Sequence, residues 1–210
     1  MASFRVKGGQ RLKGEIQPQG AKNEALQIIS AVLLTAEPVH IKKIPDIRDV
    51  NKLIELLADF GVQIEKTGPE SYIFTAKDVN LDFLESDQFK EKAASLRGSI
   101  MILGPLLARF GKGKIPKPGG DKIGRRRLDT HFIGFQKLGA KFDYHIGTGF
   151  YNVSAKELTG TYLHLDEASV TGTANIIMAA SMAKGTTTVY NDPKRNYHQR
   201  CPYRSAGHHP

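Results

Sequence analysis

The sequence predicts an α/β fold made of a repeated unit. Three apolar helical segments begin near residues 23, 100 and 175, so they recur about every 75 residues. Each is followed by a strand-like segment, and the first two strands are followed by an amphipathic segment that ends at a glycine. We therefore expect two repeats and the beginning of a third.

The first repeat is predicted in the order helix, strand, helix, strand. An apolar helix over residues 23–34 ends before Pro38, and residues 39–41 have the character of a strand. The alternating segment VQIEK at 62–66 is a second strand. The helix between the two strands ends before Gly61 and shows apolar residues at helical spacing, namely Ile47, Val50, Leu53, Ile54, Leu57 and Phe60.

The second repeat follows the same order, and the third is expected to be incomplete. A helix over residues 100–108 ends near Gly111 and passes into a short basic strand. The alternating segment AKFDYHI at 140–146 follows an amphipathic helix marked by Phe132, Phe135 and Leu138. A third apolar helix over 175–183 leads into a strand at 186–190. Such repeats could reflect duplication for packing alone. Their polar residues fall at helix starts, however, and this favours a functional role.

The positive charge of the chain is confined to two segments. Residues 112–127 carry seven Lys or Arg and one Asp, a charge of +6, and residues 192–210 carry four Lys or Arg and one Asp, a charge of +3. These segments account for the whole net charge of +9. Surfaces that bind nucleic acids usually spread their cations over a face and add aromatic side chains for stacking on bases. A compact phosphorylated ligand therefore fits the segment 112–127 better than a nucleic acid.

Composition narrows the class of protein further. No stretch of the sequence approaches the roughly 20 apolar residues of a membrane span, and the N-terminal residues lack the apolar core of a signal peptide. A single cysteine rules out an internal disulfide framework, so a cytoplasmic protein is expected.

Polar residues stand at the start of each apolar helix. Lys22 and Asn23 open the first, and the free backbone N–H groups of a buried helix start suit a phosphate or carboxylate. A solvated Lys22 and a capping Asn23 are the alternative. Arg97 stands before the second helix, where a surface ion pair is the alternative, and hydroxyl residues between Ser169 and Thr173 precede the third. Together these residues predict anion-binding helix starts gathered on one side of the domain.

Four segments of the sequence resemble one enzyme family. They are GAKNEAL at 20–26, LRGSIMILGPLLARFGKG at 96–113, PGGDKIGRRRLDTHFIGFQKLGA at 118–140 and SVTGTANIIMAA at 169–180. Their order and spacing are similar to those of the UDP-N-acetylglucosamine 1-carboxyvinyltransferases. The resemblance implies an enolpyruvyl transferase of peptidoglycan synthesis, built from repeated βαβαββ-like units that form inside-out α/β barrel domains. It further implies small-molecule substrates, phosphoenolpyruvate and UDP-N-acetylglucosamine, with no cofactor, metal, nucleic acid or membrane partner.

The resemblance implies roles for individual residues. Lys22 and Asn23 match a pair that contacts phosphoenolpyruvate, and Arg97 and Arg126 match arginines that bind substrate. The uridine diphosphate part is expected along Arg127, Leu128, Asp129 and Thr130. The commoner pattern at 126–130 is Arg-Pro-Val-Asp-Leu, so only Arg126 and Asp129 match it outright. Ser169 and Val170 match a second stretch along the nucleotide sugar, while Thr171 replaces a more usual glycine.

Asp121 occupies the position that most members of the family fill with cysteine. The reaction adds the sugar 3-hydroxyl to carbon 2 of phosphoenolpyruvate while carbon 3 receives a proton, so a general acid is needed, and Asp121, Lys22 and Arg126 are the predicted catalytic residues. Neighbouring cations lower the pKa of a carboxyl group, and desolvation must oppose them. A plain turn residue is the alternative for Asp121. An aspartate here also implies resistance to fosfomycin, which alkylates the cysteine.

The resemblance covers residues 1–191 and predicts three regions. Residues 1–21 are expected to join a second domain, residues 22–191 to form the first catalytic domain, and residues 192–210 to be an aberrant or frameshifted tail. The tail contains Cys201 and three histidines without convincing metal-ligand spacing. Because the second half of the family is missing, we expect the chain alone to be inactive, and the sequence does not give its oligomeric state.

Two other functions remain open at this stage. The same architecture supports transfer to shikimate 3-phosphate, although the motif that begins at Pro118 argues against that substrate. A nucleic-acid-binding module that uses residues 112–127 is the second alternative, and its affinity would fall steeply with salt.

Overall fold

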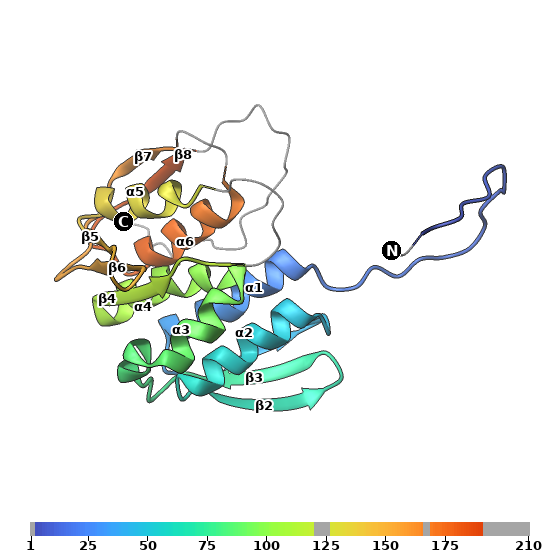
Figure 1. The fold of residues 1–210 in the computed structure, drawn as a ribbon, viewed down its shortest axis with the longest axis horizontal. Helices are drawn as coiled ribbons and strands as arrows, with labels where there is room; N and C mark the ends of the chain where they lie inside the picture. The colour runs from blue at the N-terminus through green and yellow to red at the C-terminus, as the bar shows by residue number, and fades with distance from the viewer. Residues whose placement is uncertain (1–2, 120–126, 166–168, 191–210) are drawn as a thin grey trace, which may run out of the picture.

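Three small sheets flank a group of helices in the part of the chain that the structure describes (Figure 1). This structure is a computed structural model, and it describes residues 3–119, 127–165 and 169–190. The combination of helices and sheets confirms the predicted α/β class. Closure of the elements into an inside-out barrel stays a prediction from the resemblance.

The first repeat forms a three-stranded antiparallel sheet packed on helices. Its strands are ordered β1-β3-β2, so that Phe74 of β3 lies opposite both Val39 of β1 and Ile64 of β2. The second helix ends as predicted, because Gly61 adopts a φ of +87° that other residues rarely adopt. The elements are α1 (Lys22–Ala31), η1 (Val32–Leu34), β1 (Val39–Lys42), α2 (Arg48–Asp59), β2 (Gln63–Gly68) and β3 (Ser71–Thr75).

The second repeat has the same topology. Its strands are ordered β4-β6-β5 and are again antiparallel, so β4, β5 and β6 correspond to β1, β2 and β3. The elements are η2 (Leu81–Glu85), α3 (Asp87–Ala94), η3 (Arg97–Ile102), α4 (Leu103–Phe110), β4 (Lys112–Pro116), α5 (Asp129–Lys137), β5 (Lys141–His145) and β6 (Phe150–Ser154). The repeat inferred from the sequence is therefore present in the fold.

Part of a third unit completes the described chain. It consists of β7 (Tyr162–His164), α6 (Val170–Ala180) and β8 (Thr188–Tyr190), and its two strands are parallel. The helix starts earlier than the predicted 175 because the Ser169 hydroxyl accepts a hydrogen bond from the Gly172 N–H at 3.1 Å. It ends before the predicted 183 because the Ser181 hydroxyl donates to the Met178 carbonyl at 2.7 Å, and Met182 is half exposed.

The predicted helix over residues 100–108 also differs from the observed structure. Residues 97–102 form the 3₁₀ helix η3, and the α-helix α4 begins only at Leu103. The buried Ser99 hydroxyl lies 2.8 Å from the Ala93 carbonyl and 2.7 Å from the Leu96 carbonyl, so it bonds to backbone groups of the preceding turns. This local bonding competes with regular α-helical geometry.

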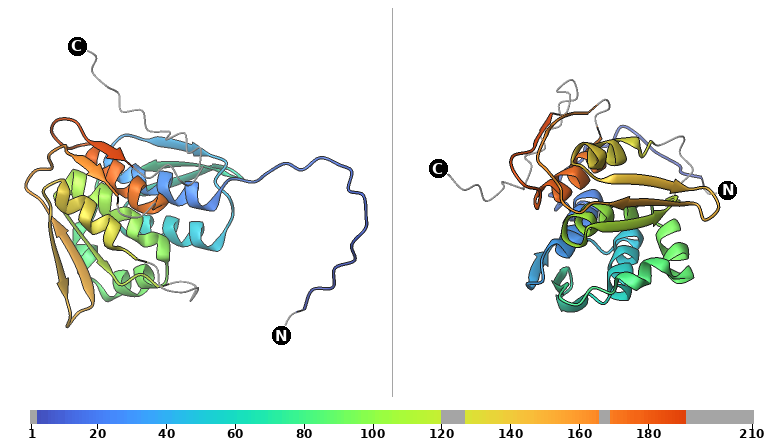
Figure 2. Two further views of the ribbon diagram at one scale, coloured as in Figure 1. Left: turned by 90° about the horizontal axis from the view of Figure 1, so that it is seen from above. Right: turned by 90° about the vertical axis from the view of Figure 1, so that its left-hand side faces the viewer.

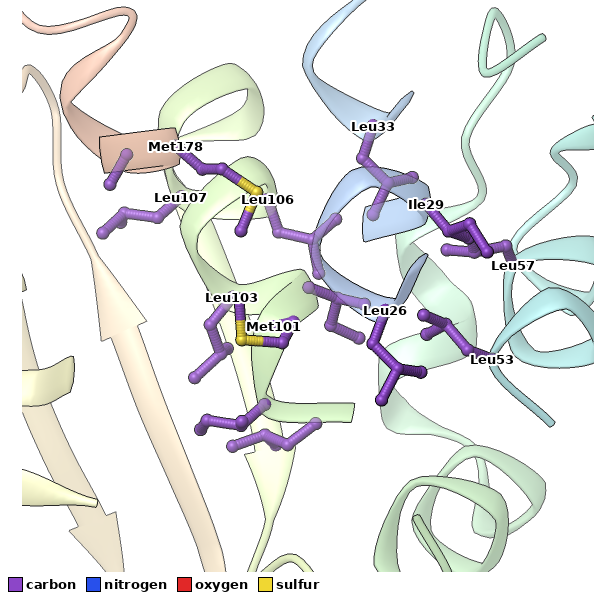
Figure 3. Close-up of a cluster of buried hydrophobic side chains, with 14 of the residues drawn as sticks. Leu26, Ile29, Leu33, Leu53, Leu57, Met101, Leu103, Leu106, Leu107 and Met178 are labelled. Atoms are coloured by element: carbon purple, nitrogen blue, oxygen red, sulfur yellow. The ribbon is translucent and has the colours of Figure 1, made fainter. Parts of the chain in front are cut away.

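The core lies where α1, α2, α4 and α6 meet (Figure 3). Leu26 and Ile29 of α1 lie next to Leu53 and Leu57 of α2 on one side, and Leu33 of η1 is buried above them. On the other side lie the side chains of η3, α4 and α6, including Met101, Leu103, Leu106 and Met178. Burial of side chains of this size stabilises the fold by about 1.5–3 kcal/mol each, so this core holds the helix starts in fixed positions.

Residues 3–21 form neither helix nor strand and extend away from the helices (Figure 2). Their large apolar side chains are exposed, with Phe4 at 96%, Leu12 at 96% and Ile16 at 93%. No helix within the described ranges is both long enough and apolar enough to span a membrane.

Candidate active site

A cleft of about 670 Å³, here called the main cleft, lies where five helix starts converge. Residues from α1, α2, η3, α5 and α6 line it, together with the segments just before η3 and α5. Among the residues that the structure describes, the lining holds a single carboxylate, that of Asp49, and five cationic side chains: Lys22, Arg48, Lys52, Arg97 and Arg127. This excess of positive charge suits a ligand with several negative charges.

The start of α1 places Lys22 and Asn23 in the main cleft. Ala21 stands at the N-cap position and has no side-chain acceptor for the first backbone N–H groups, so Asn23 is not the cap. The first turn of α1 therefore favours an anion. Lys22 Nζ lies 2.9 Å from Asp49 Oδ2, and both side chains are 43% exposed. An exposed pair of this kind contributes little stability, so a ligand anion can compete with Asp49.

The polar face of α2 adds two cations that the sequence reasoning missed. Arg48 and Lys52 are four residues apart and therefore lie on one side of the helix. Lys52 Nζ donates to the Ser95 hydroxyl at 3.1 Å, which links α2 to the segment before η3. Sequence reasoning from the apolar positions of α2 predicts only core packing. The spacing of Arg48 and Lys52, four residues apart, would have indicated a second, cationic face of the same helix.

The start of η3 brings Arg97 to the same cleft. The neighbouring Gly98 packs directly on α1, because a Cβ atom at residue 98 would lie 3.0 Å from Leu26 Cδ1. This close approach sets the distance between the two predicted anion-binding helix starts. Arg97 and Lys22 thus lie in one site, as the sequence analysis expected.

The start of α5 contributes Arg127 and Leu128 to the main cleft. Arg127 Nε donates to Asp129 Oδ2 at 2.8 Å, and both side chains are about half exposed. Arg127 and Thr130 also line a second cavity of about 250 Å³, here called the side cavity. The rest of its lining comes from α5, β7 and the residue after β7, namely Ile133, Lys137, Tyr162, Leu163, His164 and Leu165.

The start of α6 reaches the main cleft through Thr171. Among the described residues that line the cleft, neither Ser169 nor Val170 is present. The Ser169 side chain instead caps α6 by accepting from the Gly172 N–H, and Val170 is the first residue of the helix. In this stretch the residue that lines the cleft is therefore Thr171, and not the predicted Ser169 or Val170.

A buried histidine, His131, forms part of the wall of the main cleft. Burial, and secondarily the positive charge of Arg97, lower the pKa of His131 from 6.5 to about 4. Its imidazole is therefore neutral near pH 7. The Nδ1 atom lies 3.0 Å from the Asn175 side-chain nitrogen, and Nε2 lies 3.5 Å from the Thr171 hydroxyl. Sequence reasoning missed His131 because its partners are 40 and 44 residues away.

The predicted residues Asp121 and Arg126 lie outside the described residues, as does the tail 192–210. Gly119, immediately before the undescribed segment 120–126, is held closely. Its N–H donates to the Ala94 carbonyl at 2.7 Å, and a Cβ atom here would lie 2.2 Å from that same oxygen. Only glycine fits this position, so the segment after β4 is held against the end of α3.

No cluster of three or more His, Cys, Asp or Glu side chains that could hold a metal ion occurs among the residues the structure describes. The described lining of the cleft is instead rich in Lys and Arg side chains, which donate hydrogen bonds and do not ligate metal ions.

Comparison with known proteins identifies a family that the sequence matches. Residues 6–200 match the EPSP synthase (3-phosphoshikimate 1-carboxyvinyltransferase) family. A UDP-N-acetylglucosamine 1-carboxyvinyltransferase of Bacteroides fragilis is 63% identical over 200 residues, which are 95% of this chain and 46% of that protein. The protein of the same name from Porphyromonas gingivalis is 57% identical over 200 residues, with the same coverage.

Solved structures agree on the fold. The enolpyruvyl transferase NikO from Streptomyces tendae has a TM-score of 0.69 at 20% identity, over 87% of this chain and 42% of that chain. An EPSP synthase from Acinetobacter baumannii has a TM-score of 0.66 at 18% identity, over 90% of this chain and 43% of that chain. The chain thus spans under half the length of the relatives that it matches. On the strength of the family match and of relatives as much as 63% identical, the chain belongs to the EPSP synthase family of enolpyruvyl transferases.

Proposed function

We propose that this chain forms the first half of a UDP-N-acetylglucosamine 1-carboxyvinyltransferase. The enzyme would transfer the enolpyruvyl group of phosphoenolpyruvate to the 3-hydroxyl of UDP-N-acetylglucosamine and release phosphate. The observation that carries the proposal is the main cleft, in which five cations face one carboxylate at converging helix starts. The name of relatives that are 57–63% identical to this chain, UDP-N-acetylglucosamine 1-carboxyvinyltransferase, supports the choice of sugar substrate.

The charges of the main cleft suit the anions of both substrates. Phosphoenolpyruvate has a carboxylate and a phosphate, and the nucleotide sugar has a diphosphate. Lys22 and Asn23, at the uncapped start of α1, are proposed to bind phosphoenolpyruvate, with Arg97 and Arg126 as further anion-binding residues. Release of Lys22 from its exposed pair with Asp49 would accompany binding.

The side cavity offers room for the nucleotide end of the sugar substrate. Arg127 lines both the main cleft and the side cavity, so a single extended ligand can reach from one to the other along the start of α5. Arg127, Leu128, Asp129 and Thr130 are proposed to contact its uridine diphosphate part. Ser169 and Val170 stay proposed as residues along the nucleotide sugar. Because the Ser169 hydroxyl already caps α6, we propose that they contact the ligand through their backbone.

The proposed chemistry has two steps. In the first, the oxygen of the 3-hydroxyl bonds to carbon 2 of phosphoenolpyruvate while its O–H bond breaks and that proton leaves to solvent, and carbon 3 gains a proton, for which Asp121 is the proposed donor. In the second, carbon 3 loses a proton and the C–O bond to phosphate breaks, which restores the double bond and releases phosphate. Lys22 and Arg126 are proposed to stabilise the developing negative charge.

The proposal assigns a role to each of three regions of the chain. Residues 1–21 would pack against the second half found in the relatives, which agrees with the exposed apolar side chains of that segment. Residues 22–191 would form the first catalytic domain. Residues 192–210 would be an aberrant tail. The reaction would need no cofactor and would take place in the cytoplasm as part of peptidoglycan and cell-wall synthesis.

Calorimetric titration of the 210-residue chain with UDP-N-acetylglucosamine tests the proposal. We expect saturable binding, and replacement of Arg97 by alanine should weaken it about 10- to 100-fold because a charge-assisted contact is lost. Arg11→Ala is the matched control, since Arg11 is exposed on the N-terminal segment. Equal affinity of the wild-type chain and Arg97→Ala would contradict the role of the cleft.

The same titration separates the alternatives. Preferential binding of shikimate 3-phosphate would favour enolpyruvyl transfer to that substrate instead. This is the reaction after which the matching family is named. Binding of an oligonucleotide that weakens steeply with salt would favour the nucleic-acid module.

A further inference from the structure

The side-chain amide of Asn175 is held in one orientation at the junction of α4 and α6. Asn175 is fully buried, and two backbone groups identify its atoms. The Gly104 N–H can only donate, so the atom 2.8 Å away is the amide oxygen. The Ile100 carbonyl can only accept, so the atom 2.8 Å from it is the amide nitrogen. The usual ambiguity between the two amide atoms is therefore absent.

This orientation determines where the proton of His131 resides. One hydrogen of the Asn175 amide nitrogen goes to the Ile100 carbonyl, which leaves the second for the His131 Nδ1 atom, 3.0 Å away. Nδ1 must then be an acceptor, and a neutral imidazole with an unprotonated Nδ1 carries its proton on Nε2. The burial of His131 and the charge of Arg97, which keep the ring neutral, agree with this assignment.

The protonated Nε2 atom faces the hydroxyl of Thr171, which lines the main cleft. The Nε2 to Oγ1 distance of 3.5 Å is long, but its direction is set, because Nε2 can only donate. The Thr171 oxygen is thus an acceptor toward the protein. Its own O–H hydrogen remains available for the cleft, where Arg97 and Lys22 already favour an anion.

We propose that Thr171 is a ligand-binding residue that donates a hydrogen bond to a phosphate oxygen of the bound nucleotide sugar, and that His131 and Asn175 are positioning residues that orient its hydroxyl. A neutral donor adds a contact to phosphate without a further cation beside Arg97. The inference deepens the proposed function and rests on it for the identity of the ligand.

The tautomer of His131 is measured directly by NMR of the 210-residue chain with ¹⁵N-labelled histidine. At pH 7 we expect His131 to be neutral with its proton on Nε2. The substitution Asn175→Asp should reverse the tautomer, because a carboxylate accepts from Nδ1–H and leaves Nε2 as an acceptor for the Thr171 hydroxyl. A proton on Nδ1 in the wild-type chain would overturn the proposed orientation.

Ligand titration tests Thr171 itself and does not depend on folding of the Asn175 variant. Thr171→Val removes the hydroxyl at nearly constant volume and should weaken UDP-N-acetylglucosamine binding about three- to tenfold, whereas Thr171→Ser should bind within about twofold of the wild-type chain. Ser181→Ala, which removes a hydroxyl at the far end of α6, should have no effect. Equal binding by Thr171→Val and the wild-type chain would overturn the inference.

Pyrophosphate as a second probe separates this inference from the proposed function. If the wild-type chain binds pyrophosphate but not the nucleotide sugar, and Thr171→Val weakens that binding, the proposed function fails while the role of Thr171 stands. If Thr171→Val binds both probes as the wild-type chain does, only the role of Thr171 fails. Absence of binding to either probe would overturn both.

Discussion

Replacement of Asn175 by alanine should strongly destabilise the fold. The fully buried side chain makes three hydrogen bonds, to the Gly104 N–H, the Ile100 carbonyl and the His131 ring, at 2.8, 2.8 and 3.0 Å. The Ile100 carbonyl also accepts from the Leu103 N–H, so it keeps one partner. The Gly104 N–H and the His131 Nδ1 atom would each lose the partner described here. A buried polar group without a partner costs about 1–3 kcal/mol, so for these two groups we expect a loss of about 2–6 kcal/mol.

Urea denaturation followed by far-ultraviolet circular dichroism is the suitable assay, because the chain contains no tryptophan for fluorescence. Asn51→Ala is the matched control. The Asn51 amide makes one exposed hydrogen bond, to Asp46 Oδ1 at 2.7 Å, and its removal should change the unfolding free energy by less than about 0.5 kcal/mol. A loss below about 1 kcal/mol for Asn175→Ala would refute the reasoning, since the junction would then have another way to satisfy its polar groups.

Three further predictions concern pH, turnover and inhibition. Because the folded-state pKa of His131 is about 4 and the ordinary value is 6.5, the unfolded chain binds the proton more readily. Stability should therefore fall between about pH 6.5 and pH 4, by up to about 1.4 kcal/mol per pH unit, and His131→Gln should flatten this slope in urea titrations at several pH values. The 210-residue chain should bind substrate but release no phosphate in a colorimetric assay, and sustained release would show that the missing half is dispensable. In an enzyme completed with the second half of the Bacteroides fragilis relative, the chain with Asp121 should resist fosfomycin, while Asp121→Cys should remain active and be inactivated over time, because a thiolate attacks an epoxide far better than a carboxylate does. Asp121→Asn should lose about 100-fold or more in rate, and full activity of that variant would end the role of Asp121 as proton donor.

Elements with strong apolar periodicity could be predicted from the sequence because their burial dominates their energetics. The faces of α2 and α5 and the apolar run of α1 each point into the core, and the helices that end at Gly61, Gly111 and Gly139 do so with the positive φ angles that glycine permits. The strands β3 and β6 were missed, although each is the central strand of its sheet. Their short segments contain adjacent apolar residues without clean alternation, and their position depends on pairing with two distant strands.

The site was predictable where it uses helix starts and unpredictable where it uses tertiary contacts. Lys22 and Asn23 open α1 and Arg97 opens η3, and this local pattern predicted that they line the cleft. His131 and the charged face of α2 reach the main cleft only because separate repeats pack together. The hydrogen bond between His131 and Asn175 joins residues 44 positions apart. Nothing in the neighbouring sequence indicates that either side chain is buried and hydrogen-bonded.

The proposed function predicts that binding and catalysis can be measured separately on the 210-residue chain. The five cations of the main cleft all belong to the described part of the chain, so the groups proposed to hold the substrate anions are present without the second half. Catalysis also requires a closed site in which water is excluded and the reacting atoms are aligned, and alignment alone can contribute about 7–11 kcal/mol to lowering the barrier. An open half-site can retain most of its ligand contacts and still lose nearly all of that alignment. The chain should therefore bind the nucleotide sugar measurably while turnover stays undetectable, and the difference between those two measurements reports the contribution of closure.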